Sequence, residues 1–203
     1  MPAGGRTDIS RTVHVTLTPS NMIDLGSTAP DFQLPDTDGN LVSLADFESH
    51  KGLLVIFMCN HCPYVKHIRG ALADFARRNE PRGVAVVGIN ANDASTHPAD
   101  SLERMVEEVQ AVGYTFPYLH DETQEIAQAY RALCTPDLFL YDEDRRLVYR
   151  GQFDDSRPGH DVEVTGKDIQ SAVDALLDAR AVPQDQKPSV GCSIKWKPGN
   201  EPN

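Results

Sequence analysis

The stretch that decides the fold is LLVIFMCNHCPYV, which spans residues 53–65. Its first six residues form a continuous apolar run, which is typical of a strand buried on both faces. Two cysteines follow directly, Cys59 and Cys62, and after them apolar side chains recur at helical spacing as far as Ala76. The sequence therefore predicts a strand, a CxxC turn and an amphipathic helix, in that order.

The patterns further along the chain predict an α/β domain around this unit. A second apolar run at residues 84–89 is expected to lie parallel to the first, since a helix connects the two by a right-handed crossover. Two more helical patterns follow, then a β-hairpin over residues 138–150 and a last helix near residues 169–177. This order predicts a central mixed β-sheet with helices on both faces.

The length and composition of the chain favour one domain with an extension at each end. The chain has 203 residues, of which 40% are hydrophobic and 24% charged, as expected for a globular protein with a core. We predict an N-terminal extension (1–23), a central domain (24–182) and a polar C-terminal tail (183–203). The extension contains one strand-like run, residues 12–17, and the tail carries Cys192.

The charge balance disfavours nucleic acid and membrane as partners. Thirty acidic and 19 basic residues give a formal charge of −11, which repels a phosphate backbone. No stretch reaches the ~20 apolar residues of a membrane helix, and residues 1–18 lack the apolar run of a secretory signal. We therefore expect a cytoplasmic protein, in a reducing compartment where vicinal thiols serve catalysis or bind metal.

The CxxC motif is the candidate catalytic centre. A helix N-terminus carries unpaired N–H groups and partial positive charge, which stabilise a thiolate. The spacing places Cys62 in the first turn, close enough to Cys59 for a disulfide. His61 between them is expected to add positive charge and to lower the pKa of Cys59. The motif predicts a thiol–disulfide oxidoreductase without a cofactor, in which Cys59 attacks and Cys62 resolves.

Three interpretations of the motif stay open at this level. The first is exchange with protein or small-molecule disulfides, with a separate thiol as reductant. The second is a thiol peroxidase that uses Cys59 or Cys62. The third is a non-catalytic module in which Cys59, His61 and Cys62 bind zinc or a partner. A closed zinc site needs four ligands, and Cys134 and Cys192 are single and distant in sequence, so we assign no metal.

Residues 24–180 carry a further set of markers: Ala29-Pro30-Asp31-Phe32, Asp38-Gly39, the strand–CxxC–helix unit, Thr135-Pro136 and the hairpin after them. Together they resemble the thioredoxin-like superfamily, above all the redoxin branch of peroxiredoxin-like (AhpC/TSA-related) proteins. The resemblance implies a thioredoxin-like fold with a cis bond between Thr135 and Pro136. It also implies that Pro136 packs against the CxxC and that the backbone of Thr135 binds a substrate strand.

Two departures from the family pattern bear on the activity. Thioredoxins place a tryptophan before the first cysteine and bury an acid in the preceding strand, whereas this chain has Met58 and an apolar run. Peroxiredoxins carry the peroxidatic cysteine at the place of Cys62 and a threonine at the place of Cys59. The missing threonine disfavours efficient peroxide reduction. An arginine for that reaction would be Arg150 or Arg157.

Two more cysteines are candidate accessory redox residues. Cys134 precedes Thr135-Pro136, and it either lies at the rim of the CxxC or serves as a small buried hydrophobe. Cys192 lies ten residues beyond the predicted domain, and ten residues of chain span up to ~33–36 Å. The tail can therefore reach the CxxC, where Cys192 resolves a disulfide, or Ile194 and its neighbours pin the tail over apolar surface.

Overall fold

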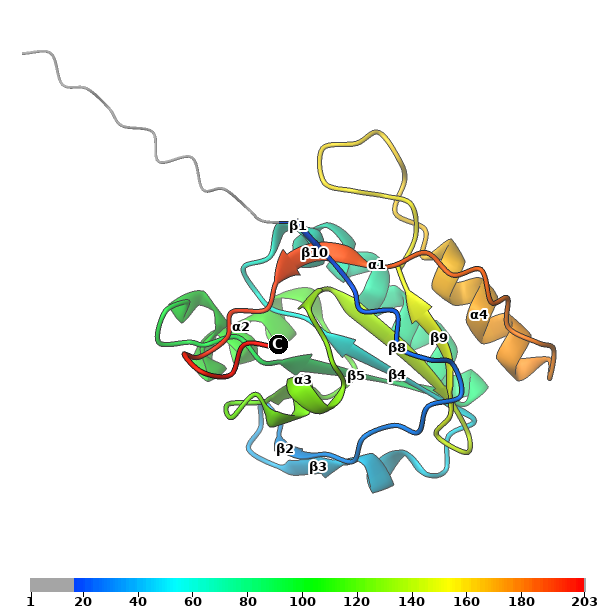
Figure 1. The fold of residues 1–203 in the computed structure, drawn as a ribbon, viewed down its shortest axis with the longest axis horizontal. Helices are drawn as coiled ribbons and strands as arrows, with labels where there is room; N and C mark the ends of the chain where they lie inside the picture. The colour runs from blue at the N-terminus through cyan, green and yellow to red at the C-terminus, as the bar shows by residue number, and fades with distance from the viewer. Residues whose placement is uncertain (1–16, 203) are drawn as a thin grey trace, which may run out of the picture.

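The centre of the molecule is a five-stranded sheet with the order β6-β5-β4-β8-β9 (Figure 1). The structure is a computed structural model and describes residues 17–202. Strand β4 lies parallel to β5 and antiparallel to β8, while β6 joins β5 in parallel and β9 joins β8 antiparallel. The strands are β4 (Gly52–Phe57), β5 (Val84–Asn90), β6 (Tyr118–His120), β8 (Asp137–Asp142) and β9 (Leu147–Gly151). The predicted mixed sheet is confirmed.

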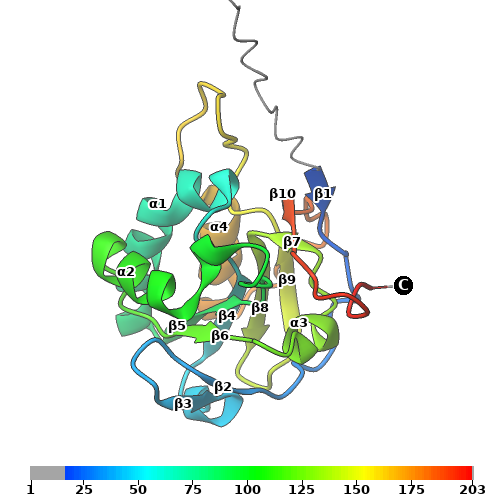
Figure 2. The same cartoon turned by 90° about the vertical axis from the view of Figure 1, so that its left-hand side faces the viewer.

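Helices cover both faces of this sheet, as predicted (Figure 2). Helices α1 (Pro63–Asn79), α2 (Leu102–Val112) and α4 (Lys167–Leu177) pack on one face. The other face carries α3 (Glu125–Ala129) and the hairpin of β2 (Gln33–Pro35) and β3 (Leu41–Ser43). Three short 3₁₀ helices lie at Leu44–Phe47, Glu80–Arg82 and Pro98–Asp100.

Two apolar cores, one on each face of the sheet, explain why β4 is apolar throughout. Side chains alternate along a strand, so Leu54 and Ile56 enter the core under α1, while Val55 and Phe57 enter the core under α3. All six residues of β4 are buried. Burial of one such side chain contributes about 1.5–3 kcal/mol, so a polar residue on either face would weaken a core.

A separate three-stranded sheet joins the two ends of the chain, in the order β1-β10-β7. Its strands are β1 (Leu17–Pro19), β7 (Cys134–Thr135) and β10 (Val190–Ser193), all antiparallel. Strand β10 was not predicted, because the tail has little apolar pattern and the strand forms only through pairing with distant segments. Most of the N-terminal strand predicted over residues 12–17 lies outside the described residues.

Helix α1 begins later than predicted, since Cys62 was expected inside the first turn. Cys62 is the N-cap, with the extended backbone angles φ −63° and ψ 123°, and Pro63 is the first helical residue. A residue before proline is disfavoured in the helical region, whereas proline itself suits the first helical position. The CxxC therefore lies in the loop that connects β4 to α1, with Cys62 at the mouth of the helix.

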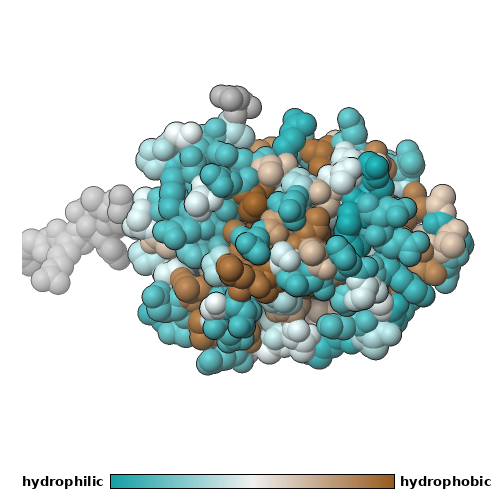
Figure 3. Space-filling model, turned by 90° about the horizontal axis from the view of Figure 1, so that it is seen from below, coloured by the Kyte–Doolittle hydropathy of each residue, from teal (hydrophilic) through white to brown (hydrophobic). Residues whose placement is uncertain are grey.

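The surface agrees with the acidic composition. Seen from below, one face is mostly hydrophilic with separate apolar patches (Figure 3). The large hydrophobic side chains that stay exposed between residues 17 and 202 are Leu17, Leu41, Leu102 and Val162. Within the same range, every helix is too short or too polar to pass through a lipid bilayer.

Candidate active site

Three of the four cysteines meet at the mouth of α1. The sulfur of Cys62 lies 3.1 Å from the sulfur of Cys192, which reaches it from β10. Cys59 contacts the Thr135 hydroxyl at 3.4 Å, and the Cys62 sulfur lies 3.1 Å from the Thr135 carbonyl oxygen. All three thiols are free and buried. The tail thus reaches the CxxC, and Cys62 is the central sulfur of the three.

The bond between Thr135 and Pro136 is cis, as the resemblance implied. Thr135 ends β7, and its side chain points to Cys59. The edge of β7 is not free, however, because Cys192 of β10 is the register partner of Thr135. Substrate binding by the Thr135 backbone stays a prediction, and it requires that β10 move away or itself serve as the bound strand.

The pKa values of the two CxxC thiols shift in the directions opposite to the sequence prediction, which expected the lowered pKa at Cys59. Hydrogen bonds from Cys192 and Cys59 lower the pKa of Cys62 far below the usual value of a thiol, against the opposing effect of burial. Burial raises the pKa of Cys59, and hydrogen bonding to Cys62 and the charge of Asp100 raise it further. As a thiol Cys62 donates to the Thr135 carbonyl, and as a thiolate it would accept hydrogen bonds from both outer thiols.

His61 interacts more closely with Asp100 than with Cys59. Its Nδ1 lies 2.5 Å from a carboxylate oxygen of Asp100 and 3.9 Å from the Cys59 sulfur. An N–H at this position donates to the carboxylate, which is the closer and stronger acceptor. The His61 ring stacks on that of His97, with 5.1 Å between the ring centroids. The expectation that His61 lowers the pKa of Cys59 is therefore wrong.

Asp100 fastens the CxxC loop. Its carboxylate accepts the backbone N–H groups of Asn60 (2.8 Å) and His61 (3.2 Å) and the side-chain amide of Asn92 (2.8 Å). Burial pushes the pKa of Asp100 up, but hydrogen bonds from His61 and Asn92 outweigh it and leave the pKa below its usual value. A buried carboxylate with this many donors holds the loop in one conformation.

Cys134 lies apart from the other three cysteines. Neighbouring residues of a strand point to opposite sides, so Cys134 faces away from Cys59 while Thr135 faces it. The sulfur of Cys134 is buried and its hydrogen-bond partner is the carbonyl of Pro136, at 3.7 Å. Burial, followed by the charge of Asp137, raises the pKa of Cys134. This placement agrees with a small buried hydrophobe.

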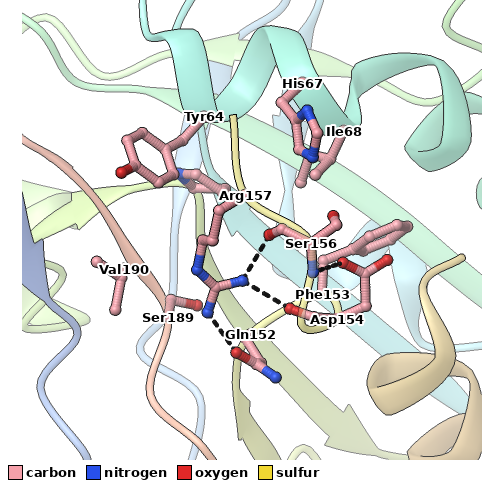
Figure 4. Close-up of a pocket in the computed structure, with 11 residues that line it drawn as sticks. Tyr64, His67, Ile68, Gln152, Phe153, Asp154, Ser156, Arg157, Ser189 and Val190 are labelled. Carbon is pink, nitrogen blue, oxygen red and sulfur yellow. Dashed lines mark hydrogen bonds between the residues drawn. The ribbon is translucent and has the colours of Figure 1, made fainter. Parts of the chain in front are cut away.

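Neither arginine considered for peroxide chemistry contacts a described cysteine. Arg150 donates to the Ile23 carbonyl (2.7 Å) and to Gln186 (2.8 Å). Arg157 lines a small pocket beside Pro136, where it donates to the carbonyls of Asp154 and Ser156 and to Gln152 (Figure 4). Both guanidinium groups are committed to fixing loops of the chain.

Cys59, His61 and Asp100 offer donor atoms within 4.8 Å of one another, which raises the question of a metal. The donor set does not fit a closed zinc site. It holds three residues instead of four, and the Asp100 carboxylate is already saturated by N–H donors. A metal would have to displace the bonds that hold the CxxC loop.

Asp100, Asn92 and Asp137 were missed in the sequence. Asp100 and Asn92 lie on the connection after β5 and meet the CxxC only through folding. Asp137 opens β8 opposite Phe57 of β4, and burial raises its pKa to about 8. The strand before the CxxC has no buried acid, and the buried acid Asp137 lies on the neighbouring strand β8. An acidic residue at the start of an otherwise apolar strand was its one signal.

The known proteins that this chain resembles in sequence include thiol redox proteins. The model of the AhpC/TSA family matches residues 25–150. Peroxiredoxin Q of Gentiana triflora is 27% identical over 161 residues, which cover 74% of this chain and 68% of that protein. Thiol-disulfide oxidoreductase ResA of Geobacillus kaustophilus (strain HTA426) is 28% identical over 127 residues, which cover 63% and 68%.

Solved structures share the fold of this chain. The crystal structure of a hypothetical protein from Sinorhizobium meliloti 1021 is 55% identical, with a TM-score of 0.89, and the match covers 90% of this chain and 100% of that one. Thioredoxin-like structures of lower identity share the fold. The fold is therefore thioredoxin-like, and the relatives support a redox function.

Proposed function

This chain belongs to the AhpC/TSA family, and from that premise we propose that it is a thiol–disulfide oxidoreductase whose working dithiol is Cys59–Cys62. The observation that carries the proposal is the environment of Cys62, a sulfur at the mouth of a helix with a thiol on either side. A thiolate is the attacking species in disulfide exchange, and the two thiols beside Cys62 favour its thiolate form.

The first step follows from that charge. The Cys62 thiolate attacks one sulfur of a disulfide R–S–S–R, forms a Cys62–S–S–R mixed disulfide and releases R–S⁻. Sequence reasoning gave the attack to Cys59 and the resolution to Cys62. The proposal reverses these roles, because the pKa of Cys59 is raised and that of Cys62 is lowered.

The second step uses the proton that Cys59 holds at rest. Once Cys62 is in the mixed disulfide, its charge is gone, and with it one cause of the raised pKa of Cys59. Cys59 then gives its proton to the departing thiolate and attacks the Cys62 sulfur. R leaves as a thiol, and a Cys59–Cys62 disulfide remains. One cysteine thiolate and one cysteine thiol have reduced one disulfide to one thiolate and one thiol, so electrons and protons balance.

The test is equilibration of the full chain with oxidised and reduced glutathione, with the thiol state of each cysteine determined by mass spectrometry. We run it on the Cys192→Ser protein, so that the CxxC pair is measured alone. We expect a two-electron transition between about −200 and −270 mV, the range of exchange catalysts. If no Cys59–Cys62 disulfide forms, the proposal is wrong.

Single cysteine variants in the same background separate the two roles. Cys62→Ser is expected to lower the rate of reaction with oxidised glutathione by about tenfold or more, because an ordinary thiol is only a few per cent thiolate at pH 7. Cys59→Ser should instead accumulate glutathione on Cys62. Cys134→Ser is the matched control and should react at the parental rate. The opposite pattern would return the attack to Cys59.

A thiol peroxidase is the second candidate, and the same thiolate favours it. The chain has no threonine at the peroxiredoxin position, and Arg150 and Arg157 are engaged elsewhere. We therefore expect hydrogen peroxide to oxidise Cys62 no faster than a free thiolate, measured by stopped flow. A rate far above that of a free thiolate would replace disulfide exchange by peroxide reduction.

The zinc-binding module is the third candidate and can be tested on the same preparation. The saturated Asp100 carboxylate argues against it. Stoichiometric zinc in the purified protein that is lost when the cysteines are alkylated would support the module and contradict the exchange mechanism.

A further inference from the structure

Strand β10 occupies the edge of the molecule at which a substrate strand is expected. It pairs antiparallel with β7, with Cys192 opposite Thr135 and Ser193 opposite Cys134. The next residue continues the pairing, since the N–H of Ile194 donates to the Leu133 carbonyl at 3.0 Å. The chain thus fills its own strand-binding edge, directly before Pro136, with a strand that carries a cysteine.

Gly191 permits the close approach of this strand. A Cβ on Gly191 would lie 2.0 Å from the carbonyl oxygen of Thr135, a distance that no backbone tolerates. Any other residue would push β10 away from β7 and carry the neighbouring Cys192 with it. The glycine therefore sets the distance between Cys192 and Cys62.

Several contacts hold β10 in register. On its outer edge β1 pairs with it, with Leu17 opposite Cys192. Beyond its end, Ile194 is buried in the core under α3, and the backbone N–H of Lys195 donates to Asn92 at 2.8 Å. Asn92 also donates to Asp100, so the tail and the CxxC loop share one anchor. Cys192 is consequently held at the site by the folded structure.

We propose that Cys192 is a third redox cysteine of this site, which forms a reversible disulfide with Cys62. The geometry for it is present at rest: the two sulfurs lie 3.1 Å apart, both buried, and no other described cysteine lies between them. The proposal rests on the proposed function, because Cys62 must first accept a mixed disulfide.

The step balances with the same disulfide substrate. Cys192 gives up its proton and attacks the Cys62 sulfur of the Cys62–S–S–R mixed disulfide. The bond to R breaks, R leaves as a thiol with that proton, and a Cys62–Cys192 disulfide remains. Cys59 can then attack Cys62, which transfers the disulfide to the CxxC pair and returns Cys192 to a thiol. Cys62 is thereby the sulfur that both partners share.

The test uses the full chain and oxidised glutathione as the probe. After acid quench and alkylation of the remaining thiols, peptide mass spectrometry maps the disulfides of Cys59→Ser, Cys192→Ser and Cys134→Ser. We expect Cys59→Ser to form an intramolecular Cys62–Cys192 disulfide and to release the second glutathione. Cys134→Ser is the control, and its molecules should show either the Cys59–Cys62 or the Cys62–Cys192 disulfide, so that both are found in the sample. The proposal is overturned if Cys59→Ser keeps glutathione on Cys62 while Cys192 remains a thiol.

The two variants separate this inference from the proposed function. Cys192→Ser reports on the CxxC dithiol, and Cys59→Ser reports on Cys192. A Cys62–Cys192 disulfide in the second, without a Cys59–Cys62 disulfide in the first, would remove the CxxC mechanism and keep the inference. The reverse result would remove the inference alone.

Gly191→Ala tests the placement without removing a thiol. It should lower the rate of Cys62–Cys192 formation by about tenfold, equivalent to about 1.4 kcal/mol, and should speed alkylation of Cys62. Circular dichroism checks that the variant is folded. An unchanged rate in a folded variant would contradict the assignment of β10 as the strand that presents Cys192. If the variant does not fold, the result for Cys59→Ser decides.

Discussion

Asp100 and Asp137 are the same residue type at the same burial, each with none of its surface exposed, yet their pKa values shift in opposite directions. Asp100 receives N–H donors from Asn60, His61 and Asn92. Asp137 receives the N–H of Leu133 at 3.3 Å, and its other oxygen has no partner among the described residues. Burial alone does not decide the charge of a buried acid; the donors around it do.

The cysteines repeat this contrast on the two sides of β7. Cys62 is buried between two thiols that lower its pKa, whereas Cys134 is buried beside Asp137 and its pKa is raised. The side of the strand that faces the CxxC presents the Thr135 hydroxyl to Cys59, and the other side presents the Pro136 carbonyl as an acceptor to Cys134. For the cysteines as for the aspartates, the groups around a buried side chain decide the direction of its pKa shift, and the lowered pKa is found on the CxxC side of β7.

Of the substitutions considered, removal of the Asp100 carboxylate should have the largest effect on the free energy of unfolding. Asp100→Ala leaves the buried donors on Asn60 and Asn92 without an acceptor, so we expect the free energy of unfolding to fall by about 3–5 kcal/mol. Urea denaturation under reducing conditions measures it. Loss of less than about 1 kcal/mol would mean that the carboxylate does not fasten the loop.

Asp137, unlike Asp100, should make the free energy of unfolding depend on pH in the way expected of a carboxyl that is neutral in the folded protein. Its pKa in the folded protein is about 8, above the ordinary 3.8, so the neutral carboxyl stabilises the fold fully below about pH 4. Between about pH 4 and pH 8 that contribution to the free energy of unfolding falls by about 1.4 kcal/mol per pH unit. Above pH 8 it is gone. Asp137→Asn should therefore gain about 2–3 kcal/mol over the parent between pH 5 and pH 7.

The control for this pH series is Asp144→Asn, which alters an exposed aspartate in the turn between β8 and β9. It should follow the parent protein at every pH. If Asp137→Asn shows the same slope of stability against pH as the parent, then Asp137 is ionised in the folded protein and the contrast with Asp100 disappears.

A double-mutant cycle measures how much one donor, Asn92, contributes to the stabilisation of the buried Asp100 carboxylate. Asn92→Ala and Asp100→Ala, alone and together, isolate the bond of 2.8 Å between the two side chains. We expect a coupling energy of about 1–2 kcal/mol in urea denaturation, as for a hydrogen bond to a charged group. A coupling near zero would assign the low pKa of Asp100 to its other donors.

Much of the architecture could be predicted because local patterns specify it. The apolar run before Cys59 produced β4, buried on both faces, and the helical spacing after Cys62 produced α1. The cis bond before Pro136 followed from a family resemblance. Strand β10 escaped prediction because its residues carry no alternating pattern and its register depends on β1 and β7, which lie far away in sequence.

The site divides in the same way. The sequence by itself determined that two cysteines stand between a buried strand and a helix, since spacing and local hydropathy fix that arrangement. Sequence reasoning assigned the thiolate to Cys59 because of the helix N-terminus and of His61 beside it. The tertiary structure set the direction of the pKa shifts, since Cys192 lies 3.1 Å from Cys62, the Asp100 carboxylate lies within 4.8 Å of Cys59, and both arrive from distant segments. A pKa reports all donors and charges around a sulfur, and only folding brings those groups together.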